Sequence, residues 1–315
     1  MEKKLSILIP AYNQVSLARR CLYYLSEQTY KNFLVILQDD AGQENYQNLC
    51  KEYPDLEIIY SRNKENLGAI VNMIDCLTKK VETEFTMCLH EDDFIHSEYI
   101  AQAINILEKN NGIAFVGSPA YFFEPGTIFN RLSSLENDWQ KYSLAEFIDY
   151  SLNKNKLVFG SIIYRHALIK SEFLNLTKYD VFLDRPFLLS ILQNSNKKAA
   201  IFKNCFYYYQ NHPYPDKRWE SLSIENVINL YLCYENLAPG RGRSITSQYI
   251  FDFANLENKK WSEFWEFMKI GKEKGLVSWR RISVKFILAS LFIFIFGKKH
   301  YYNLFTTLKK LTKTG

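Results

Sequence analysis

Apolar runs and helical repeats alternate along the first part of the chain. The nearly unbroken apolar runs cover residues 5–10, 33–37 and 85–89, and a further short strand is expected at 56–60. The segments expected to be helical cover residues 14–27, 44–52 and 68–80. Unbroken apolar runs indicate strands buried on both faces, because an exposed face would require alternate polar positions. The order therefore predicts an α/β fold with a mostly parallel central sheet and helices on both faces.

The later part of the chain has shorter elements and ends in helices. We expect strands at 113–117 and 199–209, and helices at 97–109, 145–152, 167–173, 185–193, 223–237 and 261–272. The alternation of strands and helices stops near 216–219, and a basic tail begins near Gly275. These changes predict a domain at 1–215, a helical extension at 216–275 and a tail at 276–315.

Two of the predicted strands end in carboxylates. Residues 85–89 run into Glu91, Asp92 and Asp93, and residues 33–37 run into Asp39 and Asp40. One such ending is also typical of a solvated acidic turn, but two parallel strands place their acids at one edge of the sheet, where open α/β folds bind ligands. Clustered carboxylates favour a hard divalent cation such as Mg²⁺ or Mn²⁺. The pattern predicts a site for a nucleotide and a metal ion.

Cysteine content and the start of the sequence both point to the cytoplasm. The six cysteines form no CxxC pair and several lie in apolar stretches. This is typical of free thiols in a reducing compartment. The sequence enters its first strand directly after Met1-Glu2-Lys3-Lys4, without the apolar region of a secretion signal. We therefore expect a protein that is not secreted.

The basic tail contains an apolar block. Residues 271–315 contain ten Lys or Arg and one Glu, so the rest of the chain is mildly acidic although the net charge is +5. The block at 286–296 is shorter than the roughly 20 residues that span a bilayer. Its basic flanks favour a helix lying on the inner face of the cell membrane over nucleic-acid binding. A buried helix that closes the C-terminal domain is the alternative.

Five motifs, in order, resemble those of family 2 glycosyltransferases. They lie at residues 6–13, 26–33, 38–40, 65–68 and 91–93. The departures from the family pattern are Ala41-Gly42, His90-Glu91, Ser97, Leu183 and Gln210. The resemblance implies a GT-A fold over residues 1–215. It also implies an inverting enzyme that transfers a sugar from a UDP-sugar to a glycan or lipid-linked acceptor, in the synthesis of a bacterial surface polysaccharide.

The resemblance also implies roles for single residues at the donor site. Asp40 would accept a hydrogen bond from uracil, and the residues lining the base and ribose would be Pro10, Ala11, Tyr12 and Asn13. The residues approaching the nucleotide or the donor sugar would be Asn66, Gly68 and Asp92. Tyr12 is alternatively a plain loop aromatic, and Gly68 alternatively only permits a tight entry into a helix.

The resemblance assigns metal binding and catalysis to three further residues. Asp93 would hold Mn²⁺ or Mg²⁺, and His212 would bind the metal or the diphosphate unless it is only a loop residue. Glu91 is interpreted as a supporting or solvent-facing residue and not as a ligand. Asp184 would take the proton of the acceptor hydroxyl, since a hydroxyl is a weak nucleophile near neutral pH. Asp184 alternatively only caps the helix that follows it, with Asp180 as the second candidate for the base.

Two other classes of protein share parts of this pattern. A catalytically inactive protein that binds a nucleotide-sugar, or acts as a scaffold on the same fold, is the alternative to an enzyme, because Leu183 stands where the family has an acid. A nicotinamide-dependent dehydrogenase is excluded, because the first strand is followed by Pro10-Ala11-Tyr12-Asn13 and not by a glycine-rich turn.

Overall fold

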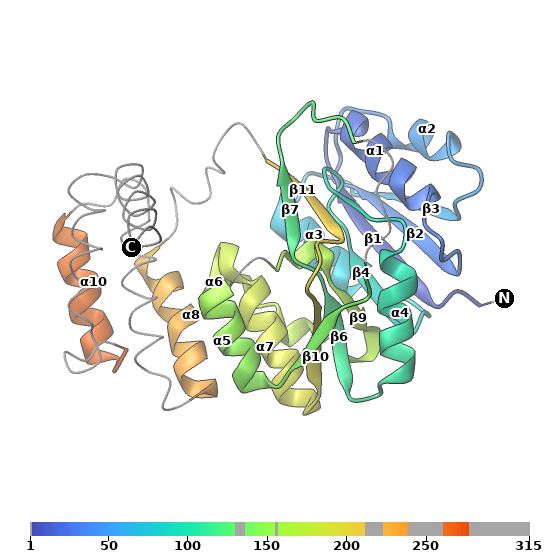
Figure 1. The fold of residues 1–315 in the computed structure, drawn as a ribbon. Helices are drawn as coiled ribbons and strands as arrows, with labels where there is room; N and C mark the ends of the chain where they lie inside the picture. Colours follow the sequence, from blue (N-terminus) through green and yellow to red (C-terminus); the bar gives the residue numbers. More distant parts are fainter. Residues whose placement is uncertain (1, 130–135, 155–156, 212–222, 239–260, 277–315) are drawn as a thin grey trace, which may run out of the picture. The chain divides into compact units, whose positions relative to one another are not determined.

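The computed structural model describes residues 2–129, 136–154, 157–211, 223–238 and 261–276 (Figure 1). The chain divides into two units, which are described separately. The first unit contains Met1–Leu174 and Phe187–Tyr214, and the second contains Asn175–Pro186 and Pro215–Gly315. The apolar block at 286–296 and His212 lie outside the described residues.

A large sheet organises the first unit. Its strands are β1 (Leu5–Ala11), β2 (Phe33–Asp39), β3 (Ile58–Arg62), β4 (Phe85–Cys88), β6 (Ile113–Gly117), β8 (Trp139–Tyr142), β9 (Ile163–Arg165) and β10 (Lys198–Phe202). They lie in the order β3-β2-β1-β4-β9-β6-β10-β8. β1 pairs in parallel with β2 and β4, whereas β9 runs antiparallel between β4 and β6. The predicted α/β architecture is confirmed, and the two acid-bearing strands flank β1.

A small sheet continues the chain beyond the acidic motif. It consists of β5 (Phe94–Ile95), β11 (Tyr207–Gln210) and β7 (Ala120–Phe123), in that order. The single late strand predicted at 199–209 is therefore wrong, because β10 belongs to the large sheet and β11 to the small one. Between them, the amide of Lys203 donates to Asp138 O and the amide of Phe206 donates to Ser118 Oγ, so the chain leaves one ladder before it joins the next.

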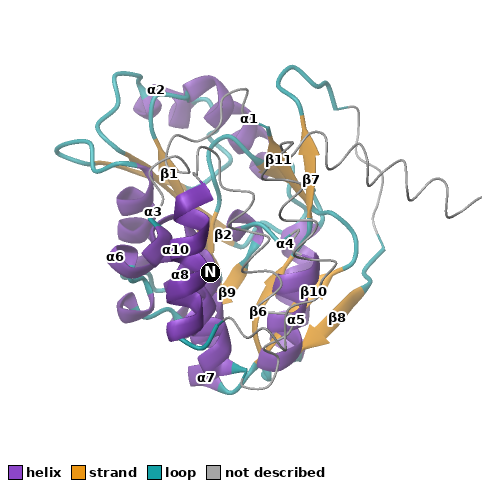
Figure 2. Cartoon of the chain, turned by 90° about the vertical axis from the view of Figure 1, so that its left-hand side faces the viewer, coloured by secondary structure: helices purple, strands orange, loops and turns teal. Residues whose placement is uncertain are grey.

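Helices cover the large sheet. They are α1 (Val15–Ser26), α2 (Tyr46–Lys51), α3 (Ala69–Thr78), α4 (Tyr99–Lys109), α5 (Leu144–Lys154) and α7 (Asp184–Ser195). Helices α1, α2 and α4 share one core cluster with the side chains of Leu5, Ile7 and Ile9. Helix α3 packs against β1 and β4. The helices are purple and the strands orange in Figure 2. The helix predicted at 167–173 is wrong: two 3₁₀ turns, His166–Leu168 and Ser171–Phe173, take its place.

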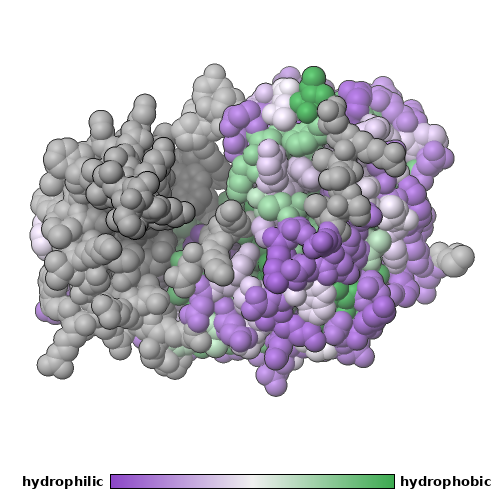
Figure 3. All heavy atoms as spheres, viewed as in Figure 1, coloured by the Kyte–Doolittle hydropathy of each residue, from purple (hydrophilic) through white to green (hydrophobic). Residues whose placement is uncertain are grey.

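On the face shown in Figure 3, hydrophilic side chains of the described residues alternate with smaller hydrophobic areas. Strand β7 contributes two half-exposed aromatic side chains, Tyr121 and Phe122, at the edge of the small sheet. Their ladder partners on β11 are Tyr208 and Tyr209. The small sheet is therefore aromatic across both of these strands.

The described part of the second unit is helical. It contains α6 (Leu176–Tyr179), the turn Asp180–Phe182, α8 (Ile224–Leu237) and α10 (Trp261–Glu273). Ser223 caps α8 by accepting a hydrogen bond from the amide of Asn226 at 3.1 Å. The side-chain amide of Asn226 in turn donates to Lys178 O at 3.2 Å, which ties α8 to α6. Among the helices of the described residues, none has the length and apolar composition that a bilayer crossing requires.

Candidate functional site

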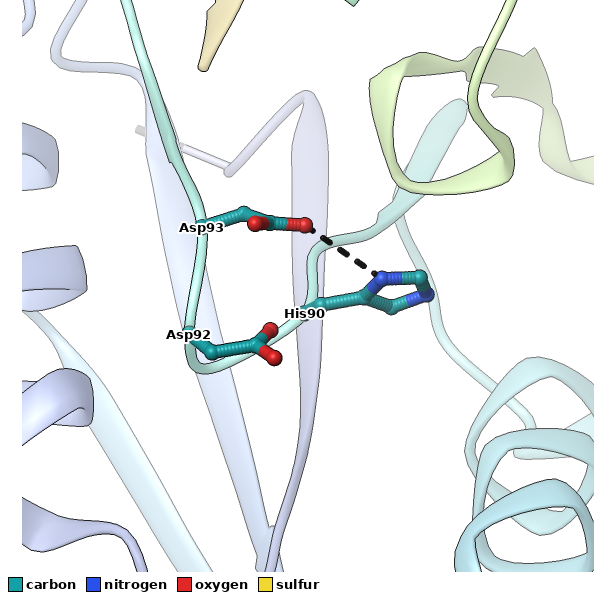
Figure 4. Close-up of side chains that lie close together, drawn as sticks. All are labelled: His90, Asp92 and Asp93. Atoms are coloured by element: carbon teal, nitrogen blue, oxygen red, sulfur yellow. Dashed lines mark ion pairs between the residues drawn. The ribbon is translucent and has the colours of Figure 1, made fainter. Parts of the chain in front are cut away.

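The acidic turn His90–Asp93 begins where β4 ends. The amide of Leu89 still donates to Leu8 O, and the amide of Asp93 then donates to His90 O, which closes the turn. Figure 4 shows the side chains of His90, Asp92 and Asp93 on the same side of this turn. Ligand atoms from these three residues lie within 4.8 Å of one another.

Asp93 is held in one orientation by strand β11. Its Oδ2 accepts a hydrogen bond from the Tyr207 hydroxyl at 2.6 Å, and its Oδ1 accepts one from the Gln210 amide at 2.9 Å. His90 Nδ1 lies 3.5 Å from Asp93 Oδ2. Burial raises the pKa of the Asp93 carboxyl, and the nearby Asp92 raises it further, against the lowering effect of His90.

The donor set at this turn fits a divalent cation. Two carboxylates and one imidazole converge, which is a combination that Mn²⁺ accepts, whereas Mg²⁺ prefers oxygen alone. A bound cation would also favour the ionised form of Asp93, which burial disfavours. Asp93 and Asp92, with His90 beside them, are therefore the described residues that could hold the predicted metal.

Glu91 is buried and has a different set of contacts. Its side chain is 7% exposed, so the solvent-facing interpretation is wrong. Its Oε1 accepts from the amide of Tyr12 at 2.6 Å, and its Oε2 accepts from the Tyr46 hydroxyl at 2.6 Å. Burial raises the pKa of the Glu91 carboxyl to about 7, although both hydrogen bonds lower it. Glu91 therefore joins the acidic turn to the β1–α1 loop and to α2.

The predicted base-lining residues form the end of β1 and the loop after it. Pro10 and Ala11 are the last residues of β1, paired with Gln38 and Asp39, while Tyr12 and Asn13 are exposed. Asn13 has a φ of 53°, and its Oδ1 accepts from the amide of Gln43 at 2.6 Å. Asn13 thus connects this loop to the loop after β2.

Asp40 organises the loop that contains Asn66 and Gly68. Its Oδ1 accepts from Asn63 Nδ2 at 2.7 Å and from the Leu67 amide at 2.9 Å, and its Oδ2 accepts from the Gly68 amide at 2.9 Å. Asn66 Oδ1 also accepts from the Gly68 amide, at 2.8 Å. Gly68 has a φ of 83°, a conformation that glycine adopts without strain. The structure therefore brings Asp40, Asn66 and Gly68 together in one hydrogen-bonded loop.

The site segments are also linked to one another. The amide of Asp40 donates to Ala11 O at 2.8 Å, and the next residue, Tyr12, bonds to Glu91 through its own amide. The predicted base contact, the base-lining loop and the acidic turn thus form a continuous series of hydrogen-bonded segments at one edge of the sheet.

Asp184 belongs to the second unit, at the first position of α7. Its Oδ1 accepts from the amide of Arg185 at 2.8 Å. Asp180, the second candidate for the base, has a φ of 47° and begins the turn before it. His212 lies outside the described residues.

Sequence reasoning missed the residues that hold the acidic turn from outside. Arg20, on α1, donates to Gln210 Oε1 at 2.8 Å and to the carbonyl oxygen of Asp92, and its guanidinium lies over the rings of Phe94 and Phe123. Nothing in the spacing of the sequence connects position 20 with position 210.

Carboxylates stand at the carboxyl ends of the two strands beside β1, at the edge of the sheet where open α/β folds bind ligands. A family model described as Glycosyl transferase family 2 matches residues 6–171, more than half of the chain. The chain belongs to this family, which confirms the resemblance seen in the five motifs.

Curated relatives match in part. An uncharacterized glycosyltransferase of Haemophilus influenzae is 29% identical over 117 residues, which are 37% of this chain and 38% of that protein. The teichoic acid poly(glycerol phosphate) polymerase of Staphylococcus epidermidis is 26% identical over 270 residues, which are 83% of this chain and 36% of the polymerase. The chain thus spans little more than a third of the length of either relative.

Solved structures support the fold. S. aureus TarS 1-349 in complex with UDP superposes with a TM-score of 0.63 at 18% identity, over 88% of this chain and 82% of that one. The mannosyltransferase PcManGT from Pyrobaculum calidifontis, in complex with GDP-Man and Mn²⁺, gives a TM-score of 0.51 at 13% identity, over 99% and 81%. These similarities confirm the predicted GT-A fold.

Proposed function

We propose that this chain is an inverting glycosyltransferase that moves a hexosyl group from a UDP-sugar to a hydroxyl of a glycan or lipid-linked acceptor. The observation that carries the proposal is the hydrogen-bonded series from Asp40 through Ala11 and Tyr12 to the acidic turn. It gathers Asp40, which we assign to the base, and the carboxylates of the acidic turn, which we assign to the metal, at one sheet edge, and a nucleoside diphosphate would need both. The complex of TarS with UDP supports the choice of nucleotide.

Within this proposal, Asp40 recognises the base while it anchors the Asn66–Gly68 loop. Its Oδ2 accepts one hydrogen bond in the structure, from the Gly68 amide, and a carboxylate oxygen has room for a second donor. The imide N–H of uracil would be that donor. Pro10, Ala11, Tyr12 and Asn13 would line the base and ribose, and Asp92 would face the ribose or the donor sugar.

The reaction needs a base for the acceptor and a stabiliser for the departing diphosphate. The Asp184 carboxylate would take the proton of the acceptor hydroxyl as that oxygen attacks the anomeric carbon. A divalent cation held by Asp93, with His212 as a further candidate ligand, would neutralise the negative charge that develops on the leaving group. The Tyr207 hydroxyl and the backbone amide of Gln210 hold the Asp93 carboxylate in one orientation, which supports this role.

The cellular role follows from the relatives and the tail. A teichoic acid polymerase among the relatives supports the synthesis of a bacterial surface polymer. We place the chain on the inner face of the cell membrane, with the basic tail at 276–315 on the anionic surface, where a lipid-linked acceptor would lie. No role in nucleic-acid binding is proposed.

Calorimetry with nucleotides tests the proposal. We would titrate UDP, GDP, dTDP and CDP, with and without Mn²⁺, into wild type, Asp93→Asn and the control Asp138→Asn. Asp138 is a half-exposed carboxylate paired with Lys203, so its substitution changes the same charge away from the acidic turn. We expect UDP to bind best, Mn²⁺ to strengthen it, and only Asp93→Asn to abolish the Mn²⁺-dependent part.

Binding and turnover separate an enzyme from an inactive protein. Release of UDP from UDP-sugars should be lost in Asp184→Asn while UDP binding is retained, since Asp184 is assigned only to proton transfer. UDP binding without release of UDP from any UDP-sugar, with acceptor present, would favour the inactive alternative. Absence of binding by all four nucleotides would refute both.

A further inference from the structure

Glu91 and Tyr46 form a buried pair at the back of the proposed nucleotide site. The Glu91 side chain is 7% exposed, and Tyr46 is fully buried. The Tyr46 hydroxyl donates to Glu91 Oε2 at 2.6 Å and accepts from the amide of Gln14 at 2.8 Å. Glu91 Oε1 accepts from the amide of Tyr12 at 2.6 Å. Through one carboxylate and one hydroxyl, the pair bonds two backbone amides of the β1–α1 loop.

We propose that Glu91 and Tyr46 act as a clamp that fixes the β1–α1 loop in its nucleotide-binding conformation. In this role Glu91 is a positioning residue and not a metal ligand. The inference rests on the proposed function, because it assigns a task to residues that support the donor site. It concerns a feature of this chain, since His90-Glu91 departs from the pattern of the family.

The clamp acts on a loop with a left-handed residue at its centre. Asn13 lies between the two bonded amides and has a φ of 53°, a conformation that asparagine tolerates better than most residues but that the bonds on either side select. The amide of Val15 is also bonded, to Glu44 Oε2 at 2.9 Å. The amides of Tyr12, Gln14 and Val15 therefore donate to side chains from distant segments, and these bonds fix the backbone on both sides of Asn13.

The chemistry of the pair explains why a carboxylate and a hydroxyl are both required. In its ionised form, which predominates above its pKa of about 7, the Glu91 carboxylate accepts two hydrogen bonds without a proton of its own, and such bonds are short and strong. A hydroxyl can donate to the carboxylate and accept from the Gln14 amide at the same time. Glutamine at position 91 would direct an N–H group at Tyr46, so the hydroxyl would lose its acceptor.

The pair lies outside the group of convergent ligand atoms. That group consists of His90, Asp92 and Asp93, whereas both Glu91 oxygens are bonded to Tyr12 and Tyr46. Loss of the clamp should therefore free the nucleotide loop and leave the metal ligands in place. Without the clamp, nucleotide binding would have to order about one loop residue that is already ordered in wild type. The conformational entropy lost in that step would weaken nucleotide affinity by roughly tenfold.

The test compares Glu91→Gln, Tyr46→Phe and the double variant with wild type. Tyr53→Phe is the matched control, because it also removes a hydrogen-bonded tyrosine hydroxyl. The Tyr53 hydroxyl donates to the backbone carbonyl of Arg19, on α1, at 2.7 Å, away from the β1–α1 loop. Three quantities are measured: the Kd of UDP at saturating Mn²⁺ by calorimetry, the Kd of Mn²⁺ without nucleotide by electron paramagnetic resonance, and amide exchange of the peptide covering residues 11–16.

The clamp predicts a specific combination of results. Each single variant loses roughly tenfold in UDP affinity, the double variant loses no more than either, and exchange of the 11–16 peptide accelerates. The Kd of Mn²⁺ stays within about twofold of wild type, because the metal ligands are intact. Tyr53→Phe matches wild type in all three measurements.

Other results would overturn the clamp. A loss of Mn²⁺ affinity in Glu91→Gln but not in Tyr46→Phe would make Glu91 a metal ligand. A lower melting temperature with unchanged UDP affinity and unchanged 11–16 exchange would leave the pair a purely structural role. If wild type binds no nucleotide, the proposed function fails, and the exchange measurement still decides whether the pair fixes the loop. If Glu91→Gln does not fold, Tyr46→Phe decides alone.

Discussion

Gly160 and Tyr207 should be energetically coupled. Gly160 lies in the 3₁₀ turn Phe159–Ser161, and a methyl group added there would lie 2.2 Å from the Tyr207 hydroxyl and 3.0 Å from the ring carbon that bears it. The same hydroxyl donates to Asp93 Oδ2 at 2.6 Å. Gly160→Ala should therefore disturb Asp93 in the acidic turn through the side chain of Tyr207. Tyr207 lies far from both Gly160 and Asp93 in the sequence.

The expected cost follows from these distances. The hydroxyl has to move by about 1 Å to restore ordinary contact, which breaks its bond to Asp93. Overpacking costs about 1–3 kcal/mol and loss of a bond to a charged acceptor about 1.5–3 kcal/mol, so Gly160→Ala should cost roughly 2.5–6 kcal/mol. Tyr207→Phe should cost only the second amount. In the double variant the severe clash is absent, so its cost should fall below that of Gly160→Ala alone.

Native-state hydrogen exchange of β1 and β4 amides in EDTA measures these differences without assuming that a two-unit chain unfolds in one step. Gly112→Ala is the control, because a methyl group there meets nothing within 4 Å. Costs that simply add in the double variant would refute the reasoning, since the clash could not then involve the hydroxyl. Gly160→Ala behaving like Gly112→Ala would refute it as well.

Three further predictions concern the loops and one histidine. Gly42→Ala places a methyl group 2.6 Å from Asn13 Oδ1 and should lower the melting temperature by several degrees, for a cost of about 1–3 kcal/mol. Asp40→Asn replaces one accepting oxygen with an N–H group, which faces either the Gly68 amide or the other donors to Asp40. Because the loop then loses at least one of these bonds, amide exchange at Gly68 should accelerate. Burial lowers the pKa of His166, so the unfolded chain takes up its proton first. Between pH 7 and 5, wild type should therefore lose more thermal stability than His166→Gln.

The sequence predicted best what local pattern alone decides. Strands β1, β2 and β4 are mainly apolar because both of their faces are covered, so their positions and the acids at their ends followed from the order of residues. The direction of β9 and the division of 199–209 into two strands did not follow. The first depends on pairing between β4 and β6, and the second on bonds from Ser118 and Asp138, which lie far away in the chain.

The candidate site shows the same limit. Asp40, Asp92 and Asp93 were identifiable because acids at strand ends are conspicuous and resemble a family motif. Tyr46, Tyr207 and Arg20 were not, because they act through contacts with residues 45, 114 and 190 positions away. A tyrosine in an apolar segment resembles any other core residue until its hydroxyl is placed.

The bonds from β11 to Asp93 have a consequence for synthesis of the chain. Tyr207 and Gln210 are 114 and 117 residues beyond Asp93, so the ribosome must release β11 before the acidic turn can take its final form. Until then Asp93 lacks both of these donors, although β1, β2 and β4 can already pair. A nascent chain arrested near residue 171, where the family match ends, would therefore carry the acidic motif in its sequence without the support that orients it.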